Sequence, residues 1–204
     1  MLIPFLFKLT LPLASGIALS SCVTLPEAPL GTAAGNQTSP EPTNSVEIVQ
    51  ANRPEIKVVP VIDGLEHPWG MAWLPNGDIL ITERPGRLRI VRDGVLDPKA
   101  IAGVAEVSTV AAGQLFASQQ GGLLDIAVHP RFEENRFVYF TYSHGTQQAN
   151  RTRVARAVFD GKKLMDWQVI FEVGQAKPGG QHFGSRLTWL PDETLLVSIG
   201  DGGN

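Results

Sequence analysis

Cysteine and charge are both scarce in this sequence. Cys22 is the only cysteine among 204 residues, so no disulfide can form within the chain. Charged residues make up 18% of the sequence, and 17 basic against 20 acidic side chains leave a net charge of -3. There is also no basic run, no zinc-type spacing and no basic motif rich in aromatic residues. We therefore expect no nucleic-acid partner.

Helical periodicity is the next absence. We find no long amphipathic helical pattern, whereas 21 glycines and 15 prolines favour many turns between short strands. Apolar runs of about 4 to 7 residues, rich in Val, Ile, Leu and aromatics, follow one another from near Ile56 onward. The first run, IKVVPVI at residues 56–62, is expected to be a strand. The sequence thus predicts an all-β protein.

A hairpin pattern recurs three times along the chain. Each copy is an apolar strand, a proline, a polar turn and a second apolar strand. The copies are MAWLPNGDILIT at 71–82, IAVHPRFEENRFVYFTY at 126–142 and LTWLPDETLLVSIG at 187–200. Their prolines, Pro75, Pro130 and Pro191, are 55 and 61 residues apart, which is the length of one four-stranded blade. We therefore predict a β-propeller. A β-sandwich is the alternative, although its strands would not need to recur as near-copies.

The number of blades bears on the extent of the protein. Residues 55–204 suffice for about three blades, whereas a propeller closes with about four to eight. We therefore expect this partial propeller to be the N-terminal part of a longer protein; the alternative is that its missing half comes from elsewhere.

Residues 1–22 have the pattern of an export signal. They are apolar, contain one lysine, and end in Leu-Ser-Ser-Cys. This end resembles the bacterial lipobox, which implies that Cys22 receives a diacylglycerol and anchors the protein to a membrane without spanning it. The alternative is that Cys22 is incidental to the signal. Val23 follows the cysteine where an aspartate is absent, and this pattern resembles that of lipoproteins sorted to the outer membrane of a Gram-negative cell. We therefore expect a periplasmic protein anchored to the outer membrane. Residues 23–54 are expected to form a flexible linker.

His182 and Asp201 are the candidate catalytic pair. They stand nineteen positions apart, at the start and the end of the third hairpin, so the hairpin is expected to bring them together. A carboxylate that accepts a hydrogen bond from one imidazole nitrogen leaves the other nitrogen free as a base. The alternative is that the Gly-Asp-Gly around Asp201 only closes a hairpin. Gln119 and Gln120 precede a Gly-Gly pair that enters a strand, so either an amide is aimed at the channel or the pair forms a polar turn.

The other three histidines are interpreted as structural. His67 and His129 each precede a proline at a strand boundary, where a histidine shapes a turn or satisfies a backbone group. His144 stands in a polar stretch and is expected to lie in a solvated loop.

Three stretches resemble the family of soluble quinoprotein glucose dehydrogenases and aldose sugar dehydrogenases, also called glucose/sorbosone dehydrogenases. They are GLEHPWGMAWLPNGDILITERPGRLRIV, QGGLLDIAVHPRFEENRFVYFTY and GGQHFGSRLTWLPDETLLVSIGDGG, in the order the family has them. The resemblance covers essentially all of residues 55–204. It implies a six-bladed propeller that holds pyrroloquinoline quinone (PQQ) and Ca2+ near the channel axis, with the sugar stacked above the quinone.

The resemblance also implies roles for individual residues. His182 matches the family's catalytic base, and Asp201 matches the carboxylate that orients it. Gln120 matches a glutamine lining the sugar pocket, and Arg186 is expected to be structural. Gln181 stands where glucose-oxidising members have an aspartate that contacts the sugar, so a broader aldose range is expected. No metal ligand is assigned here, because most PQQ and calcium residues are expected beyond Asn204.

The expected function is therefore an oxidoreductase. It would oxidise the anomeric carbon of an aldose to the lactone, with hydride transfer to PQQ and His182 as the base. Electrons would pass to a periplasmic or membrane acceptor, and residues 1–204 alone are expected to show no turnover. The alternative is a non-catalytic propeller that binds carbohydrate or protein.

Overall fold

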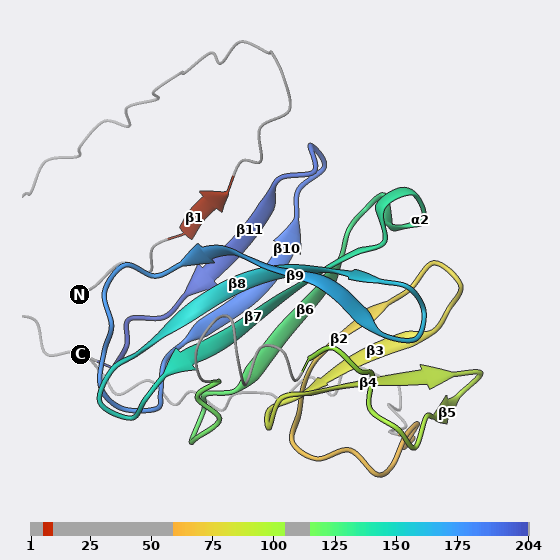
Figure 1. Cartoon of the computed structure of the whole chain (residues 1–204), viewed down its shortest axis with the longest axis horizontal. Helices are drawn as coiled ribbons and strands as arrows, with labels where there is room; N and C mark the ends of the chain where they lie inside the picture. The colour runs from red at the N-terminus through yellow and green to blue at the C-terminus, as the bar shows by residue number, and fades with distance from the viewer. Residues whose placement is uncertain (1–5, 10–58, 105–114, 204) are drawn as a thin grey trace, which may run out of the picture. The chain divides into compact units, whose positions relative to one another are not determined.

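The computed structural model describes residues 6–9, 59–104 and 115–203 (Figure 1). Cys22 and the expected linker at 23–54 lie outside the described residues. Within them, regular structure consists of antiparallel strands in three sheets and one helix of four residues. This helix is too short to cross a membrane, and the described part of the chain contains no other candidate span. The all-β prediction is confirmed.

The first sheet is a four-stranded meander in the order β2-β3-β4-β5. Its strands are β2 (Pro68–Trp73), β3 (Ile79–Glu83), β4 (Arg87–Arg92) and β5 (Val95–Leu96). The turn from β2 to β3 contains Pro75 and Gly77, and the Gly77 backbone has a φ of 90°, a left-handed value that favours glycine.

The second sheet repeats this plan in the order β6-β7-β8-β9. Its strands are β6 (Leu123–Val128), β7 (Phe137–Gly145), β8 (Asn150–Phe159) and β9 (Leu164–Glu172). The short helix α2 (Phe132–Asn135) lies in the connection between β6 and β7. Arg136 caps its C-terminal end, with a left-handed backbone whose N–H donates to the Phe132 carbonyl.

The third sheet contains β10 (Gly184–Trp189) and β11 (Leu195–Ile199). β1 (Leu6–Leu9) pairs with the other edge of β11, with Leu6 opposite Ser198 and Leu9 opposite Leu195. These four residues fall within the expected export signal, which stays a prediction.

The hairpins β2-β3, β6-β7 and β10-β11 share one irregularity, which confirms the internal repeat. In each, the register shifts by a bulge near the start of the first strand. The shifts fall between Pro68 and Met71, between Leu123 and Ile126, and between Gly184 and Leu187. The spacing of these bulges is the same as the spacing of the three prolines, so the hairpins are equivalent units. Successive meanders of this kind are the blades of a β-propeller.

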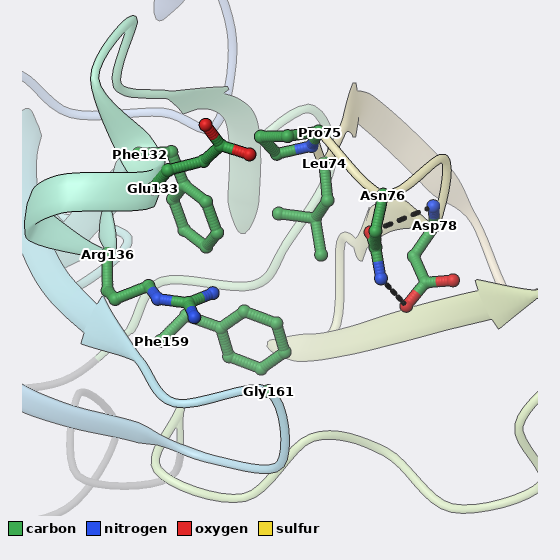
Figure 2. Close-up of a pocket in the computed structure, with 9 residues that line it drawn as sticks. All are labelled: Leu74, Pro75, Asn76, Asp78, Phe132, Glu133, Arg136, Phe159 and Gly161. Atoms are coloured by element: carbon green, nitrogen blue, oxygen red, sulfur yellow. Dashed lines mark hydrogen bonds between the residues drawn. The ribbon is translucent and has the colours of Figure 1, made fainter.

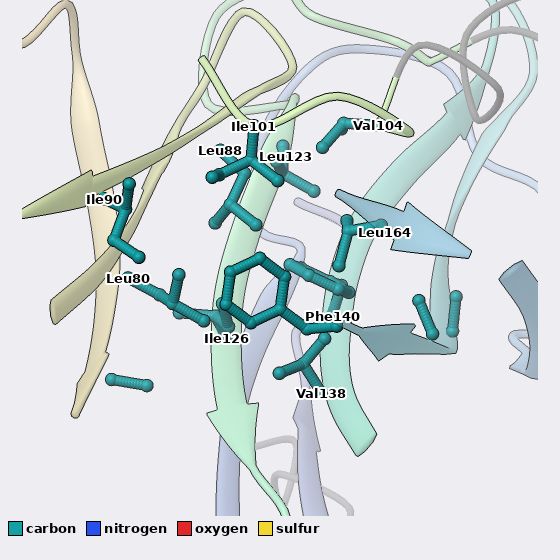
Figure 3. Packing of buried hydrophobic residues seen from close by; sticks show 14 of the residues in the cluster. Leu80, Leu88, Ile90, Ile101, Val104, Leu123, Ile126, Val138, Phe140 and Leu164 are labelled. Atoms are coloured by element: carbon teal, nitrogen blue, oxygen red, sulfur yellow. The ribbon is translucent and has the colours of Figure 1, made fainter. Parts of the chain in front are cut away.

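Apolar side chains fill the spaces between successive sheets (Figure 3). Leu80 and Ile90 of the first sheet are in one buried cluster with Ile126 and Phe140 of the second. A second cluster joins the opposite face of the second sheet to the third; its buried members are Ala127, Tyr139, Val154, Leu187, Leu195 and Val197. Because neighbouring residues of a strand point to opposite faces, the second sheet is covered on both sides, and its strands β6 and β7 are buried along most of their length.

Buried hydroxyls also connect each sheet to the next. Thr82 accepts a hydrogen bond from the Gly70 N–H at 2.9 Å, inside the bulge of its own hairpin, and donates to the Leu124 carbonyl in the second sheet. Thr141 repeats this arrangement between the second and third sheets. Ser198 occupies the equivalent place in the third sheet and accepts a backbone N–H within it.

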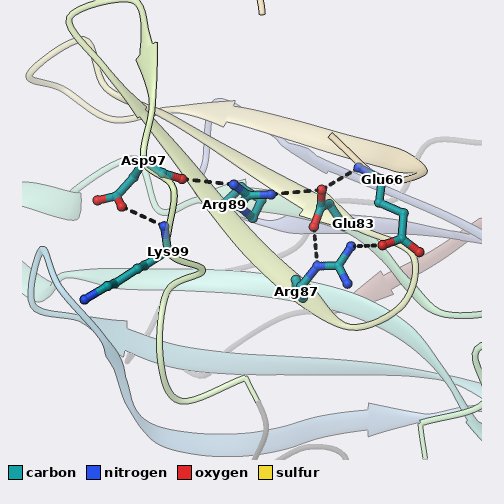
Figure 4. A network of polar contacts seen from close by, with 6 residues as sticks. All are labelled: Glu66, Glu83, Arg87, Arg89, Asp97 and Lys99. Carbon is teal, nitrogen blue, oxygen red and sulfur yellow. Dashed lines mark hydrogen bonds and ion pairs between the residues drawn. The ribbon is translucent and has the colours of Figure 1, made fainter. Parts of the chain in front are cut away.

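A buried carboxylate organises the end of the first sheet (Figure 4). Glu83 is fully buried and accepts the Glu66 N–H at 2.6 Å, Arg87 Nε at 2.5 Å and Arg89 Nη1 at 3.3 Å. Burial alone would raise the pKa of Glu83, but the Glu66 N–H, Arg87 and Arg89 together outweigh it and hold the pKa below its ordinary value. Glu83 is therefore ionised, and it ties the approach to β2 to strands β3 and β4.

Two local predictions were wrong. No strand forms over residues 59–62, the described part of the run IKVVPVI, where Val59 and Val61 are exposed and Pro60 has no N–H to donate. His144 lies in β7, opposite Arg151 of β8, and not in a loop. The second hairpin of this sheet is longer than its polar sequence indicated.

Candidate functional site

The structure brings His182 and Asp201 into direct contact. His182 precedes β10 and Asp201 follows β11, and the pairing of Gly184 with Ile199 places the two ends side by side. His182 Nδ1 lies 2.7 Å from Asp201 Oδ1. Both side chains are about half exposed, at 48% and 49%, so the pair is accessible from solvent.

The charge on Asp201 determines what the pair can do. The N–H of Gly203 donates to Asp201 Oδ1 at 2.9 Å, and this bond, followed by the His182 imidazole, holds the pKa of Asp201 below its ordinary value. An ionised carboxylate can only accept hydrogen bonds, so His182 Nδ1 is the donor. In the neutral imidazole the lone pair is then on Nε2, which is the atom that can take up a proton.

Gln120 fixes the backbone that carries His182. Its N–H donates to the Gly180 carbonyl at 2.8 Å, and its side-chain Oε1 accepts the His182 N–H at 2.9 Å. His182 has a φ of 57°, a left-handed conformation that a non-glycine residue adopts only when its surroundings impose it. Gln120 therefore holds the catalytic candidate at two points, a contact that the sequence did not indicate.

The sequence model of the family described as Glucose / Sorbosone dehydrogenase matches residues 65–204. The chain belongs to the glucose/sorbosone dehydrogenase family. The resemblance inferred from the three blade motifs is confirmed, and so is the β-propeller fold.

Named relatives place the chain more closely within the family. It is 93% identical over 204 residues to "Uncharacterized protein slr1608" of Synechocystis sp., covering 100% of this chain and 50% of that protein. It is 34% identical over 143 residues to the aldose sugar dehydrogenase YliI of Escherichia coli, covering 68% of this chain and 36% of the relative. The chain therefore spans half or less of the length of these relatives.

A solved structure of a family member has the same fold. The PQQ-bound form of an aldose sugar dehydrogenase from Streptomyces coelicolor superposes with a TM-score of 0.56 at 29% identity. The match covers 71% of this chain and 41% of that one.

In this chain, Gln181 and Lys177 lie on either side of the contact between His182 and Asp201. The exposed Gln181 side chain lies against Gly203, where a Cβ would stand 2.7 Å from Gln181 Nε2. The stem of Lys177 crosses Gly202 in the same way, and Lys177 Nζ lies 4.1 Å from the centre of the Phe183 ring. Burial lowers the pKa of Lys177, while the charge of Asp201 acts in the opposite direction. Lys177 had no sequence signal, because only the folding of its loop onto the Asp201 turn brings it here.

Arg186 and Asp125 form a structural pair beside the site. The buried Asp125 accepts the Leu187 N–H at 2.7 Å and Arg186 Nη1 at 3.2 Å, while most of the Arg186 side chain is exposed. These bonds tie β6 to β10 across neighbouring sheets.

His129 has a purely structural environment. It is buried against Trp189 and Tyr139, its Nδ1 accepts the Arg131 N–H, and burial lowers its pKa. This agrees with its interpretation as a residue that satisfies a backbone group.

Metal ligands are not assigned in this part of the chain. Among the described residues, no group of three or more His, Cys, Asp or Glu side chains could hold a metal ion. We assign none of the described residues to holding PQQ or Ca2+.

A pocket of about 400 Å³ lies away from this pair, at the turn end of the first hairpin (Figure 2). It lies between the Leu74–Asp78 turn and the short helix α2, with Phe159 and Gly161 completing the wall. Two of its polar residues bind one another, since Asn76 Nδ2 donates to Asp78 Oδ2 at 3.0 Å. We assign no ligand to it.

Proposed function

We propose that the protein is a PQQ-dependent aldose dehydrogenase that oxidises the anomeric carbon of a sugar to the lactone. Family membership supports an oxidoreductase of sugars, and the relatives named above include an aldose sugar dehydrogenase and a PQQ-bound one. The observation that carries the proposal is the 2.7 Å contact between His182 and the ionised Asp201, with both side chains about half exposed.

In this proposal His182 is the general base. Its Nε2 takes the proton of the anomeric hydroxyl while the hydride leaves the same carbon, and Asp201 stabilises the imidazolium that forms. When bound, PQQ supplies the two-electron acceptor for the hydride. The two segments at residues 180–184 and 200–203 thus align the sugar hydroxyl, and His182 receives its proton.

Gln120 and Gln181 are proposed to contact the sugar. The Oε1 of Gln120 is held by the His182 N–H, so its amide NH2 is left to donate toward a substrate hydroxyl. Gln181 is neutral and exposed, which favours a broad range of aldoses over strict selection of glucose. The full protein is proposed to use Ca2+ with PQQ and to pass electrons to a periplasmic or membrane acceptor.

The test is dye reduction by the full-length protein. The protein is loaded with PQQ and Ca2+, and a panel of aldoses is offered with an artificial electron acceptor. We expect reduction with several aldoses and a loss of at least about 100-fold in kcat for His182→Asn. The matched control is His67→Asn, because His67 is also an exposed histidine with a left-handed backbone, at φ 49°. Sugar binding without dye reduction would favour a non-catalytic propeller, and an unchanged rate in His182→Asn would exclude it as the base.

The protein is further proposed to be an exported lipoprotein. Cys22 would carry the lipid and residues 23–54 would tether the propeller to the outer membrane. Metabolic labelling with an alkyne fatty acid in a Gram-negative host tests this proposal. We expect label on the wild type and none on Cys22→Ala; an unlabelled wild type would refute the anchor.

A further inference from the structure

Arg84 connects the first sheet to the loop in front of the second. It follows β3 directly, and its Nη1 donates to the Gln119 carbonyl at 2.5 Å. Its own backbone is held on both sides, because its N–H donates to the His67 carbonyl and its carbonyl accepts the Leu123 N–H, each at 3.0 Å. The guanidinium therefore projects from a fixed point.

Gly122, the second glycine of the QQGG stretch, makes room for this arginine. A Cβ on Gly122 would stand 2.5 Å from Arg84 Cγ and 2.2 Å from the Arg84 carbonyl oxygen. Gly122 also has a φ of 151°, which side-chain-bearing residues rarely adopt. The stretch that we interpreted as a polar turn or an aimed amide thus also contains the glycine against which Arg84 packs.

Gln119 is the residue that Arg84 holds. Its backbone is left-handed, with a φ of 55°, and its side chain lies against Gly180, where a Cβ would stand 3.0 Å from Gln119 Cδ. A left-handed non-glycine residue persists only when neighbouring contacts impose it. The bond from Arg84 to the Gln119 carbonyl is such a contact, and it sets the direction in which the next residue, Gln120, leaves the loop.

We propose that Arg84 is a positioning residue for His182. Arg84 fixes Gln119, Gln119 sets the place of Gln120, and Gln120 holds the Gly180 carbonyl and the His182 N–H. This inference rests on the proposed role of His182 as the base. Under this proposal, a residue next to the first sheet positions the base next to the third sheet, about a hundred positions later in the sequence.

Hydrogen exchange of the full-length protein without cofactor tests the inference. In Arg84→Met we expect the amide protons of Gln120 and His182 to exchange about tenfold faster, because their hydrogen-bond partners are no longer held in place. Arg84→Lys, which keeps one donor, is expected to restore part of the protection. The matched control is Arg131→Met at the opposite end of the hairpins, which is expected to leave both amides unchanged.

Kinetics of the loaded protein give the second readout. We expect kcat to fall about tenfold in Arg84→Met, because the base is misplaced, and KM to rise as well, because the proposed sugar contact of Gln120 is displaced with it. Unchanged exchange at Gln120 and His182 would overturn the proposal, and so would faster exchange over the whole chain. The exchange measurement needs neither sugar nor PQQ, so it can be interpreted even if no aldose is oxidised.

Discussion

Replacing Thr141 with valine tests how successive blades are held together. Thr141 is fully buried; its hydroxyl accepts the Asp125 N–H at 2.9 Å and donates to the Ser185 carbonyl in the next sheet at 2.9 Å. Valine has nearly the same shape, so packing is preserved while one buried N–H and one buried carbonyl lose this partner. Each such loss costs about 1 to 2 kcal/mol, so we expect Thr141→Val to lower the free energy of unfolding by about 2 to 4 kcal/mol.

Urea unfolding followed by tryptophan fluorescence measures this change. Thr141→Ser keeps the hydroxyl and removes one buried methyl group, so it is expected to cost only about 1 kcal/mol. Thr188→Val, at an exposed position of β10, is the control and is expected to change stability by less than about 0.5 kcal/mol. If Thr141→Val were no less stable than Thr141→Ser, the hydroxyl bridge between sheets would not contribute to stability.

Three further predictions concern the site, a buried carboxylate and an exposed surface. Asp201→Asn is expected to lower kcat about 100-fold in the dye assay while leaving the circular dichroism spectrum unchanged, because an amide cannot stabilise the imidazolium; an equal rate would remove Asp201 from the mechanism. The pKa of Glu83 is lower in the folded state than its ordinary 4.5, so its stabilisation is complete above that value and is lost as the pH falls. Unfolding midpoints of Glu83→Gln should therefore depend less on pH between about pH 5 and pH 3 than those of the wild type. Trp69, Met71 and Trp73 are 45%, 58% and 60% exposed on one face of β2, so the 204-residue chain should bind a hydrophobic dye, and Met71→Lys should reduce the dye fluorescence by about half; undiminished fluorescence would place the dye elsewhere.

The hairpin repeat could be predicted because its signals are local. Proline, a polar turn and alternating apolar residues are read within about 15 residues, and a strand pairs with its immediate neighbour through that turn. The same locality explains why His182 and Asp201 could be paired from the sequence, since both belong to the third hairpin. The strand predicted for the run at 56–62 was wrong over residues 59–62, because they have no neighbouring strand to pair with in the described structure and Pro60 lacks an N–H.

Contacts between blades had no local signal. The bond from His182 to Gln120 joins residues 62 positions apart, and that from Arg84 to Gln119 joins residues 35 apart. The sequence indicated an amide near the channel but not which group it would bind. The packing of one sheet on the next decides this, because it determines which loops lie within hydrogen-bond distance.

Residue order alone was therefore sufficient for the all-β class, the repeated hairpin and the contact between His182 and Asp201, because each depends on residues that are neighbours through one turn. The three-dimensional packing of the sheets was needed to show that Gln120 accepts the His182 N–H and that Arg84 donates to the Gln119 carbonyl. It was also needed to show that Glu83 is buried and ionised, because the burial and the partners of a charge depend on residues that folding brings together from distant parts of the chain.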